Sequence, residues 1–311
     1  MAPSLEAVEL TKAYGSFTAL SQLNLKLEGA RCVGFLGPNG AGKTTTMKMF
    51  TGLISPTKGE ALINGVNVRK DKKSALNSCA SLIETPEIYP SLTPREALMM
   101  LGELRGMPRD GRMKRIDEAL GMVKMQEWEN KKVGTFSKGM KQRVNVASTL
   151  ISDPEIIILD EPTTGLDPRG MSEVRDIVKS LGNRLVFMSS HLLGEVTEVC
   201  QEVAMIDHGK LLVYDTIQNV TAKFSGNGGA VEVAFSHDLE ETTVRKVSGL
   251  SGVKGVQRSD PRHLTIRFDG GVKMQEKLFE ELAGMKVGVL SLRETATGLE
   301  DAYLKLIKEA L

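Results

Sequence analysis

Short apolar segments alternate with longer amphipathic segments over the first two thirds of the chain. The four consecutive apolar residues Ile156–Leu159 are typical of a strand that is buried on both faces. Further strands are predicted at residues 8–10, 23–27, 32–36 and 185–188, and helices are predicted from Thr93, from Arg112, from Ser137, after Pro168 and after His191. Strands that alternate with helices in this way predict a mainly parallel α/β sheet.

Three local signals give the boundaries of elements. The pair Asn64-Gly65 lies between two apolar segments and suits a type I′ turn in a β-hairpin. Thr93-Pro94-Arg95-Glu96 has the pattern of a capping box, with proline at the first helical position. A second hairpin is predicted over residues 203–214.

The last third of the chain predicts a separate small domain. Residues 225–229, Ser-Gly-Asn-Gly-Gly, have the composition of a linker. Beyond it the pattern is strand, helix, strand, strand, helix, strand, helix, which suggests a ferredoxin-like α+β fold with an added C-terminal helix. We therefore predict a first domain over 1–224, with a helical subdomain over about 85–152, and an accessory domain over 230–311.

Composition narrows the functional classes. The chain has 311 residues, of which 41% are hydrophobic and 25% charged, and its formal net charge is +1. With so little net charge, no global field directs it to nucleic acid, and we expect no nucleic-acid partner. The three cysteines lie far apart and lack zinc-site spacing, which favours reduced thiols in the cytosol. We expect neither a signal peptide nor a membrane span.

A phosphate-binding loop follows the strand that ends at Leu36. Gly37, Gly42, Lys43 and Thr44 fit the pattern G-x-x-x-x-G-K-[ST]. Glycines allow the backbone N–H groups to face a phosphate, and the next helix adds its positive N-terminus. Lys43 is placed to reach the β- and γ-phosphates of a nucleotide, and the Thr44 hydroxyl to bind Mg²⁺. The residues predicted to bind the nucleotide here are Gly37, Pro38, Asn39, Gly40, Ala41, Gly42, Lys43, Thr44 and Thr45.

Two adjacent carboxylates, Asp160 and Glu161, end the apolar strand at 156–159. Like charges at the rim of a core repel each other and are costly to desolvate. A phosphate-loop protein needs an acid near its Mg²⁺. We therefore assign Asp160 to the metal and Glu161 to the attacking water as general base.

Further motifs identify a family resemblance. Phe136–Arg143 (FSKGMKQR), the TTGLDP segment after the acidic strand, SSHLLGEV around His191 and KAYGSFTAL around Tyr14 occur in this order. Together with the phosphate loop they resemble the ATP-binding cassette (ABC) ATPases over roughly residues 4–220. Within that family the chain looks most like the ATPases that pair with separate permeases in multidrug, bacitracin-resistance or ABC-2 exporters.

The resemblance implies roles for residues outside the phosphate loop. Tyr14 would stack on adenine, and His191 would contact the γ-phosphate. Ser137 would cap a helix, so that its hydroxyl and the Gly139 N–H meet the γ-phosphate bound to another subunit, with Asp167 close to that interface. Two cassettes, in a homodimer or heterodimer, would enclose two ATP molecules.

Two positions depart from the family's pattern. The serine motif, usually Leu-Ser-Gly-Gly-Gln, has Lys138 and Met140 at its third and fifth positions. Glu84 stands where the family commonly has glutamine, a residue that approaches Mg²⁺ and the attacking water. Glutamate can bind Mg²⁺, so Glu84 is predicted as a metal and nucleotide contact, with solvent exposure as the alternative. The apolar, proline-rich segment after it, residues 86–94, suggests a docking groove for a permease.

These observations predict an ATPase subunit of a membrane exporter, located on the cytoplasmic face of the membrane through a permease. A soluble ABC-type ATPase acting on ribosomes or DNA is the alternative, but such proteins typically carry two cassettes or a long coiled-coil insertion, and neither is visible. A nucleotide-binding regulator without hydrolysis is a third class, against which Glu161 and His191 both argue.

Overall fold

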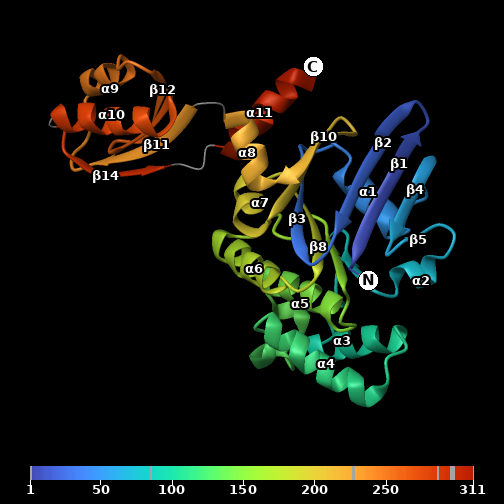
Figure 1. Cartoon of the computed structure of the whole chain (residues 1–311). Coiled ribbons are helices and arrows are strands. Elements are labelled where there is room, and N and C mark those ends of the chain that lie inside the picture. The colour runs from blue at the N-terminus through green and yellow to red at the C-terminus, as the bar shows by residue number, and fades with distance from the viewer. Residues whose placement is uncertain (1, 85, 226–227, 286, 295–297, 311) are drawn as a thin grey trace. The chain divides into compact units, whose positions relative to one another are not determined.

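The chain forms two compact units, Met1–Ile217 and Gln218–Leu311 (Figure 1). The computed structural model describes residues 2–84, 86–225, 228–285, 287–294 and 298–310. Each unit has a hydrophobic core of its own. The two units are therefore described separately.

A six-stranded sheet forms the centre of the first unit. Its order is β10-β9-β3-β8-β7-β6, and all neighbours are parallel except β10, which is antiparallel to β9. The strands are β3 (Arg31–Leu36), β6 (Cys79–Leu82), β7 (Ile156–Leu159), β8 (Leu185–Ser190), β9 (Glu202–Asp207) and β10 (Lys210–Thr216). Every residue of β7 and β8 is buried, which confirms the parallel sheet expected from continuous apolar segments.

A second, antiparallel sheet has the order β2-β1-β4-β5. Its strands are β1 (Ser4–Tyr14), β2 (Phe17–Glu28), β4 (Lys58–Ile63) and β5 (Val66–Asn67). The predicted hairpin is confirmed, because Ile63 pairs with Val66 and both Asn64 (φ 48°) and Gly65 (φ 77°) have positive φ. The first two strands are much longer than predicted.

One core joins the two sheets of the first unit and the helix after the phosphate loop, α1 (Lys43–Phe50). Phe187 of β8 lies at its centre. Its ring centroid is 5.1 Å from that of Phe35 and 6.1 Å from that of Phe50, the latter edge to face. The strand that precedes the phosphate loop and the helix that follows it are thus packed on one aromatic side chain.

The first unit also contains helices, of which α3, α4 and α5 pack on one another, while α5 also packs on β6 and α6 (Figure 1). The helices are α2 (Lys72–Leu76), α3 (Pro94–Leu104), α4 (Arg109–Met122), α5 (Lys138–Leu150), α6 (Pro168–Ser180) and α7 (Leu193–Val199), with single 3₁₀ turns at Gln126–Trp128 and Val133–Thr135. The capping box at Thr93 and Glu96 is present as predicted. The helix predicted from Arg112 begins three residues earlier, directly after Pro108. In the described parts of the chain every helix is too short or too polar to span a bilayer.

The second unit contains α8 beyond its first residue, a four-stranded sheet and three further helices. The sheet order is β12-β13-β11-β14 with all neighbours antiparallel, which confirms the ferredoxin-like topology. The elements are α8 (Ile217–Ser225), β11 (Gly228–Phe235), α9 (Glu241–Ser248), β12 (Val253–Asp260), β13 (His263–Asp269), α10 (Gly271–Gly284), β14 (Val289–Glu294) and α11 (Gly298–Ala310).

The glycine-rich segment predicted as a linker over 225–229 differs from the structure at both ends. Ser225 ends α8, and Gly228 and Gly229 already pair with β13 as part of β11. A Cβ atom on Gly229 would lie 2.6 Å from the Phe268 ring, so this glycine serves close packing. Residues 226 and 227 lie outside the described residues.

Candidate functional site

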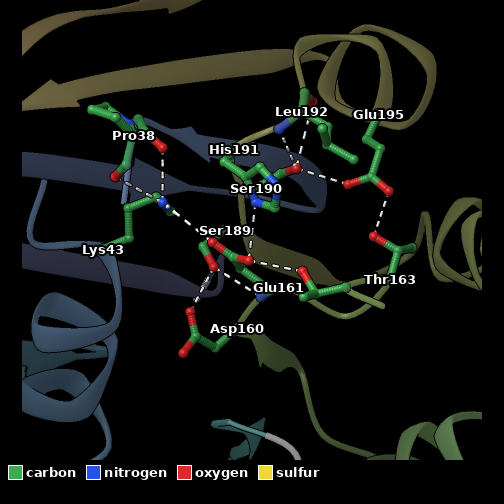
Figure 2. Close-up of polar contacts among 12 residues, drawn as sticks. Pro38, Lys43, Asp160, Glu161, Thr163, Ser189, Ser190, His191, Leu192 and Glu195 are labelled. Atoms are coloured by element: carbon green, nitrogen blue, oxygen red, sulfur yellow. Dashed lines mark hydrogen bonds and ion pairs between the residues drawn. The ribbon is translucent and has the colours of Figure 1, made fainter. Parts of the chain in front are cut away.

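The predicted phosphate loop, the acidic pair and His191 meet at one edge of the parallel sheet (Figure 2). The loop follows β3, the pair Asp160-Glu161 follows β7, and His191 follows β8. Since β3, β8 and β7 are consecutive neighbours in the sheet, the residues after their carboxyl ends converge. The topology therefore assembles a site from segments that lie between about 30 and about 150 residues apart in sequence.

Close backbone approaches explain two glycines of the phosphate loop. A Cβ atom on Gly37 would lie 2.3 Å from the carbonyl oxygen of Ile206 in β9. Gly42 has φ 106°, and a Cβ there would lie 2.7 Å from the carbonyl oxygen of Ala19. Any side chain would push the loop away from the sheet, so both positions require glycine.

Lys43, the first residue of α1, is buried with its ammonium group inside the loop. Its Nζ donates hydrogen bonds to the carbonyl oxygens of Gly37 at 2.7 Å and Pro38 at 3.1 Å, and lies 3.3 Å from Glu161 Oε1. A buried ammonium surrounded by oxygen atoms is well placed to exchange one of them for a phosphate oxygen.

Asp160 is buried at the end of β7. Its Oδ1 accepts a hydrogen bond from the Ser189 hydroxyl at 2.6 Å, and the same hydroxyl oxygen accepts one from the Glu161 N–H at 2.9 Å. Ser189, which the sequence analysis did not single out, thus orients both members of the acidic pair.

Glu161 has the positive φ of 44°, which is strained for a residue with a side chain. Its Oε2 accepts a hydrogen bond from the Thr164 hydroxyl at 2.7 Å and lies 3.0 Å from His191 Nδ1. Burial acts to raise the pKa of this carboxyl group, but the Thr164 hydrogen bond and the nearby Lys43 and His191 outweigh it and hold the pKa below its ordinary value of 4.5. Glu161 is therefore ionised and able to accept a proton at neutral pH.

A buried network lies beside these groups. The carboxylate of Glu195 on α7 accepts hydrogen bonds from the hydroxyls of Thr163 and Ser190. Ser190 ends β8. Two adjacent serines, Ser189 and Ser190, follow four apolar residues there, so the sequence itself marks a polar position at the end of this strand. Glu195 lies in an amphipathic helix with two other polar residues, Thr197 and Glu198, and nothing in the local pattern marks it as buried.

A second cluster brings together Ser137, Gly139 and Asp167. Ser137 caps α5 as predicted by accepting from the Met140 N–H at 3.2 Å, and Asp167 caps α6 by accepting from the Gly170 N–H at 3.2 Å. A Cβ on Gly139 would lie 3.5 Å from the Gly170 Cα, so the two helix N-termini are close neighbours. These residues line a cavity of about 390 Å³ that neither Lys43 nor Glu161 lines.

Two predicted contacts lie apart from both clusters. Tyr14 ends β1 with 51% of its surface exposed, and Lys12 Nζ lies 4.9 Å from its ring centroid. Glu84 has φ 59° and forms an ion pair with Lys48 of α1 at 2.5 Å, with 66% of its side chain exposed. Lys48 is one helical turn beyond Thr44. The structure thus pairs Glu84 with a lysine near the phosphate loop, and its contact with a metal stays a prediction.

The segment after Glu84 lines a groove of about 290 Å³. Its walls come from this segment, from the 3₁₀ turn at Val133–Thr135 and from the first two turns of α5. They consist of Pro86, Glu87, Ile88, Pro90, Val133, Lys138, Lys141, Gln142 and Asn145. Gln142 is buried, and its Nε2 donates to the carbonyl oxygen of Pro162 at 2.7 Å, directly after Glu161. The groove is therefore one hydrogen bond away from the acidic pair.

The oxygen donors of the site suit Mg²⁺ better than a metal whose ligands must all come from protein side chains. Among the described residues there is no group of three or more His, Cys, Asp or Glu side chains that could hold a metal ion. Mg²⁺ commonly takes one or two protein oxygens and completes its shell with phosphates and water. The buried Asp160 carboxylate and the Thr44 hydroxyl at the start of α1 are donors of that kind.

Comparisons with known protein families, sequences and structures all point to one family. The family described as "ABC transporter" matches residues 20–164. The chain is 36% identical to the bacitracin transport ATP-binding protein BcrA of Bacillus licheniformis, over 99% of this chain and 98% of that protein. It is 30% identical to the linearmycin resistance ATP-binding protein LnrL of Bacillus subtilis (strain 168), over 99% of each. A solved ATP binding subunit of an ABC transporter is similar with a TM-score of 0.64 and 26% identity, over 71% of this chain and 93% of that one.

Proposed function

The chain belongs to the ATP-binding proteins of ABC transporters, and we propose that it powers an exporter by closing on MgATP with a second cassette and driving a separate permease. As a member of this family it is an ATP-binding subunit with ATPase activity. The observation that carries the proposed mechanism is the position of Glu161, which contacts Lys43 on one side and His191 on the other.

Nucleotide binding rests on the phosphate loop. The loop N–H groups and the N-terminus of α1 would hold the phosphates, while Lys43 exchanges a carbonyl oxygen for a β- or γ-phosphate oxygen. Asp160 and Thr44 would hold Mg²⁺, which neutralises phosphate charge when bound. Tyr14, exposed at the end of β1, offers a ring face to adenine.

Hydrolysis uses the ionised carboxylate of Glu161 as general base. Glu161 takes a proton from the attacking water, and its lowered pKa keeps it available for this at neutral pH. His191 is within hydrogen-bond distance of Glu161, from where it would contact the γ-phosphate and orient the water.

A second cassette completes the site. The cavity at Ser137, Gly139 and Asp167 has two helix N-termini beside it, as an anion site requires, yet it is separate from the chain's own Lys43. We propose that it receives the γ-phosphate bound by another cassette, from a second copy or a relative. Both nucleotides would then lie between the two subunits.

The groove beside Ile88 is the proposed permease contact. It combines apolar residues and two prolines with the lysines of α5, and it connects to the acidic pair through Gln142. Docking there would place the chain on the cytoplasmic face of the membrane. Similarity over nearly the full length to proteins named for bacitracin transport and linearmycin resistance supports an exporter. The same single-cassette relatives do not favour a soluble ATPase acting on ribosomes or DNA.

Co-expression with the permease tests this proposal. Ile88→Asp and Tyr89→Asp should abolish transport and the stimulation of ATP hydrolysis by the permease. The basal rate of ATP hydrolysis by the isolated chain should be unchanged. Leu53→Asp is the control, because Leu53, on the loop between α1 and β4, is an apolar residue with 59% of its surface exposed, close to the 64% of Tyr89. If the Ile88 and Tyr89 variants still assemble and transport normally, the permease docks elsewhere.

A further inference from the structure

Glu195 is a buried acid that the proposed reaction does not use. Only 3% of its surface is exposed, although it lies on a short helix whose neighbouring acid, Glu198, is at the surface. Carboxylates are rarely buried unless hydrogen bonds replace the lost water. Here the carboxylate accepts one hydroxyl on each oxygen: Thr163 donates to Oε1, and Ser190 donates to Oε2 at 2.7 Å (Figure 2).

The two donors belong to the two segments that carry the proposed chemistry. Thr163 lies two residues after Glu161, and Ser190 directly precedes His191. The Ser190 hydroxyl oxygen also accepts from the Leu192 N–H at 2.9 Å, so it fixes the backbone on both sides of His191. A single carboxylate therefore connects the segment after β7 with the segment after β8.

His191 needs such support, because little else holds it. Its side chain is 36% exposed, and its Nδ1 contacts Glu161 Oε2 at 3.0 Å. The contacts close a ring that runs from Glu161 through His191 and Ser190 to Glu195, and back through Thr163. In such a ring the distance between His191 and Glu161 depends on the carboxylate opposite to it.

We propose that Glu195 is a positioning residue for ATP hydrolysis, which holds the His191 segment and the Glu161 segment at their working separation. It touches neither the phosphate loop nor the proposed metal ligands. The inference rests on the roles proposed for Glu161 and His191. Misplacement of a catalytic group by about 1 Å can cost about 10²-fold in rate, so the effect should fall on kcat, whereas ATP binding depends on the phosphate loop and should persist.

Substitutions in the full chain test this. Glu195→Gln keeps the shape but replaces one charged acceptor oxygen by an amide N–H, which weakens one of the two connections because its hydroxyl must turn from donating to accepting. Glu195→Ala loses both connections. We expect kcat for ATP hydrolysis to fall by about 10-fold for the glutamine variant and up to about 10²-fold for alanine, with the KM for ATP unchanged. Glu198→Gln on the same helix is the matched control, since Glu198 is 43% exposed and pairs with Lys179, and it should retain wild-type kcat.

The donors supply a second test that does not depend on the stability of Glu195→Ala. Ser190→Ala and Thr163→Val should each lower kcat with KM unchanged. Adding Thr163→Val to Glu195→Ala should cause no further loss, because the Thr163 hydroxyl acts through the Glu195 carboxylate. Unchanged kcat in Glu195→Gln and Ser190→Ala, or a KM that rises in step with the loss of kcat, would overturn the proposal and leave Glu195 a structural residue only.

His191→Ala and Glu161→Gln, measured in parallel, separate this proposal from the one it rests on. If both hydrolyse ATP at the wild-type rate, the proposed mechanism fails. If both are inactive while the Glu195 variants keep their kcat, the mechanism stands and the positioning role of Glu195 is wrong.

Discussion

The two units of the chain differ in where they place charge. The first unit buries charged side chains in its interior, among them Lys43, Asp160 and Glu195, each with hydrogen-bond or ionic partners. In the described residues of the second unit no charged side chain is buried, and the core contains apolar residues alone. A groove of about 840 Å³ lies between α10 and β14 of this unit, and the exposed Phe279 and Leu290 line it.

This difference follows from topology. Parallel strands all end at the same edge of a sheet, so the loops after β3, β7 and β8 meet and can hold several polar groups at once. In the antiparallel sheet of the second unit, neighbouring strands end at opposite edges. Buried charge is costly in either place, and Lys43 and Asp160 are buried where the strand ends converge. We infer that the chemistry belongs to the first unit.

The largest effect expected from this comparison is the loss of hydrolysis in Glu161→Gln. Loss of a general base typically costs about 10²–10⁴-fold in rate. The substitution also removes a negative charge near the γ-phosphate, so ATP should remain bound and hold two chains together. Phosphate release should be nearly abolished, and size-exclusion chromatography with MgATP should show a dimer, whereas the wild type should be mostly monomeric during turnover.

Glu155→Gln is the control for that experiment, because Glu155 is an exposed acid just before the opposite end of β7. It should behave as the wild type does. A Glu161→Gln protein with near wild-type hydrolysis would contradict the base assignment. An inactive protein that stays monomeric would contradict the enclosed dimer alone.

Aromatic truncations should separate the two cores. Phe187→Ala removes the ring that packs on Phe35 and Phe50, and Phe235→Ala empties the core of the second unit. Each should lower the free energy of unfolding of its own unit by about 3–5 kcal/mol. Only Phe187→Ala should weaken ATP binding, as measured by fluorescent-nucleotide titration and thermal unfolding. Equal loss of ATP binding in Phe235→Ala would show that the units are not independent.

A smaller effect concerns pH. The lowered pKa of Glu161 stabilises the folded protein at pH values above the ordinary value of 4.5, and this contribution is lost as the pH falls through the lowered pKa. Protonation of Glu161 should therefore not limit kcat/KM between pH 8 and about pH 5. Thr164→Val removes a hydrogen bond that lowers this pKa, so its acidic limb should move to higher pH. Thr197→Val, at an exposed threonine of α7, should leave the profile unchanged.

The smallest effect is expected for deletion of the second unit's sheet. A chain that ends at Ser225 keeps every residue of the proposed phosphate site and the whole core of the first unit. It should bind ATP with the affinity of the full chain and unfold in one cooperative transition. Recovery of only aggregated protein would indicate that the two units fold together.

Much of the fold could be predicted because local signals agreed with the final structure. The apolar segment Ile156–Leu159 is strand β7 to the residue, and Asn64-Gly65 forms the expected turn. The long strands β1 and β2 were recognised only in part. Glu9 and Gln22 have positive φ, and shifts in register interrupt the alternation of apolar and polar residues that marks a half-buried strand.

The residues of the candidate site could be predicted where they belong to a sequence motif with a known chemical role. Residues that only position other side chains could not be predicted. Lys43, Asp160 and Glu161 come from such motifs, and the structure brings them together with His191. Glu195 becomes visible only when α7 packs beside the segment after β7, because its partner Thr163 lies 32 residues away. The ion pair between Glu84 and Lys48 could not be predicted for the same reason, because the two residues lie 36 positions apart and meet only in the folded chain. At Gly229 a local pattern was misleading. The glycine-rich composition predicts a linker, but this glycine lies in strand β11 and packs against Phe268.

The order of strands in the parallel sheet also bears on how the chain is made. β3, which leads into the phosphate loop, pairs only with β8 and β9, and Cys32 lies opposite Val186. At a ribosomal rate of about 5–20 residues per second, this strand waits roughly 8–30 s for partners synthesised about 150 residues later. During that time its apolar residues need protection from premature association. The strands of the second unit lie within about 60 residues of one another and can pair soon after they emerge. We therefore expect the nascent first unit to depend on chaperones more than the second.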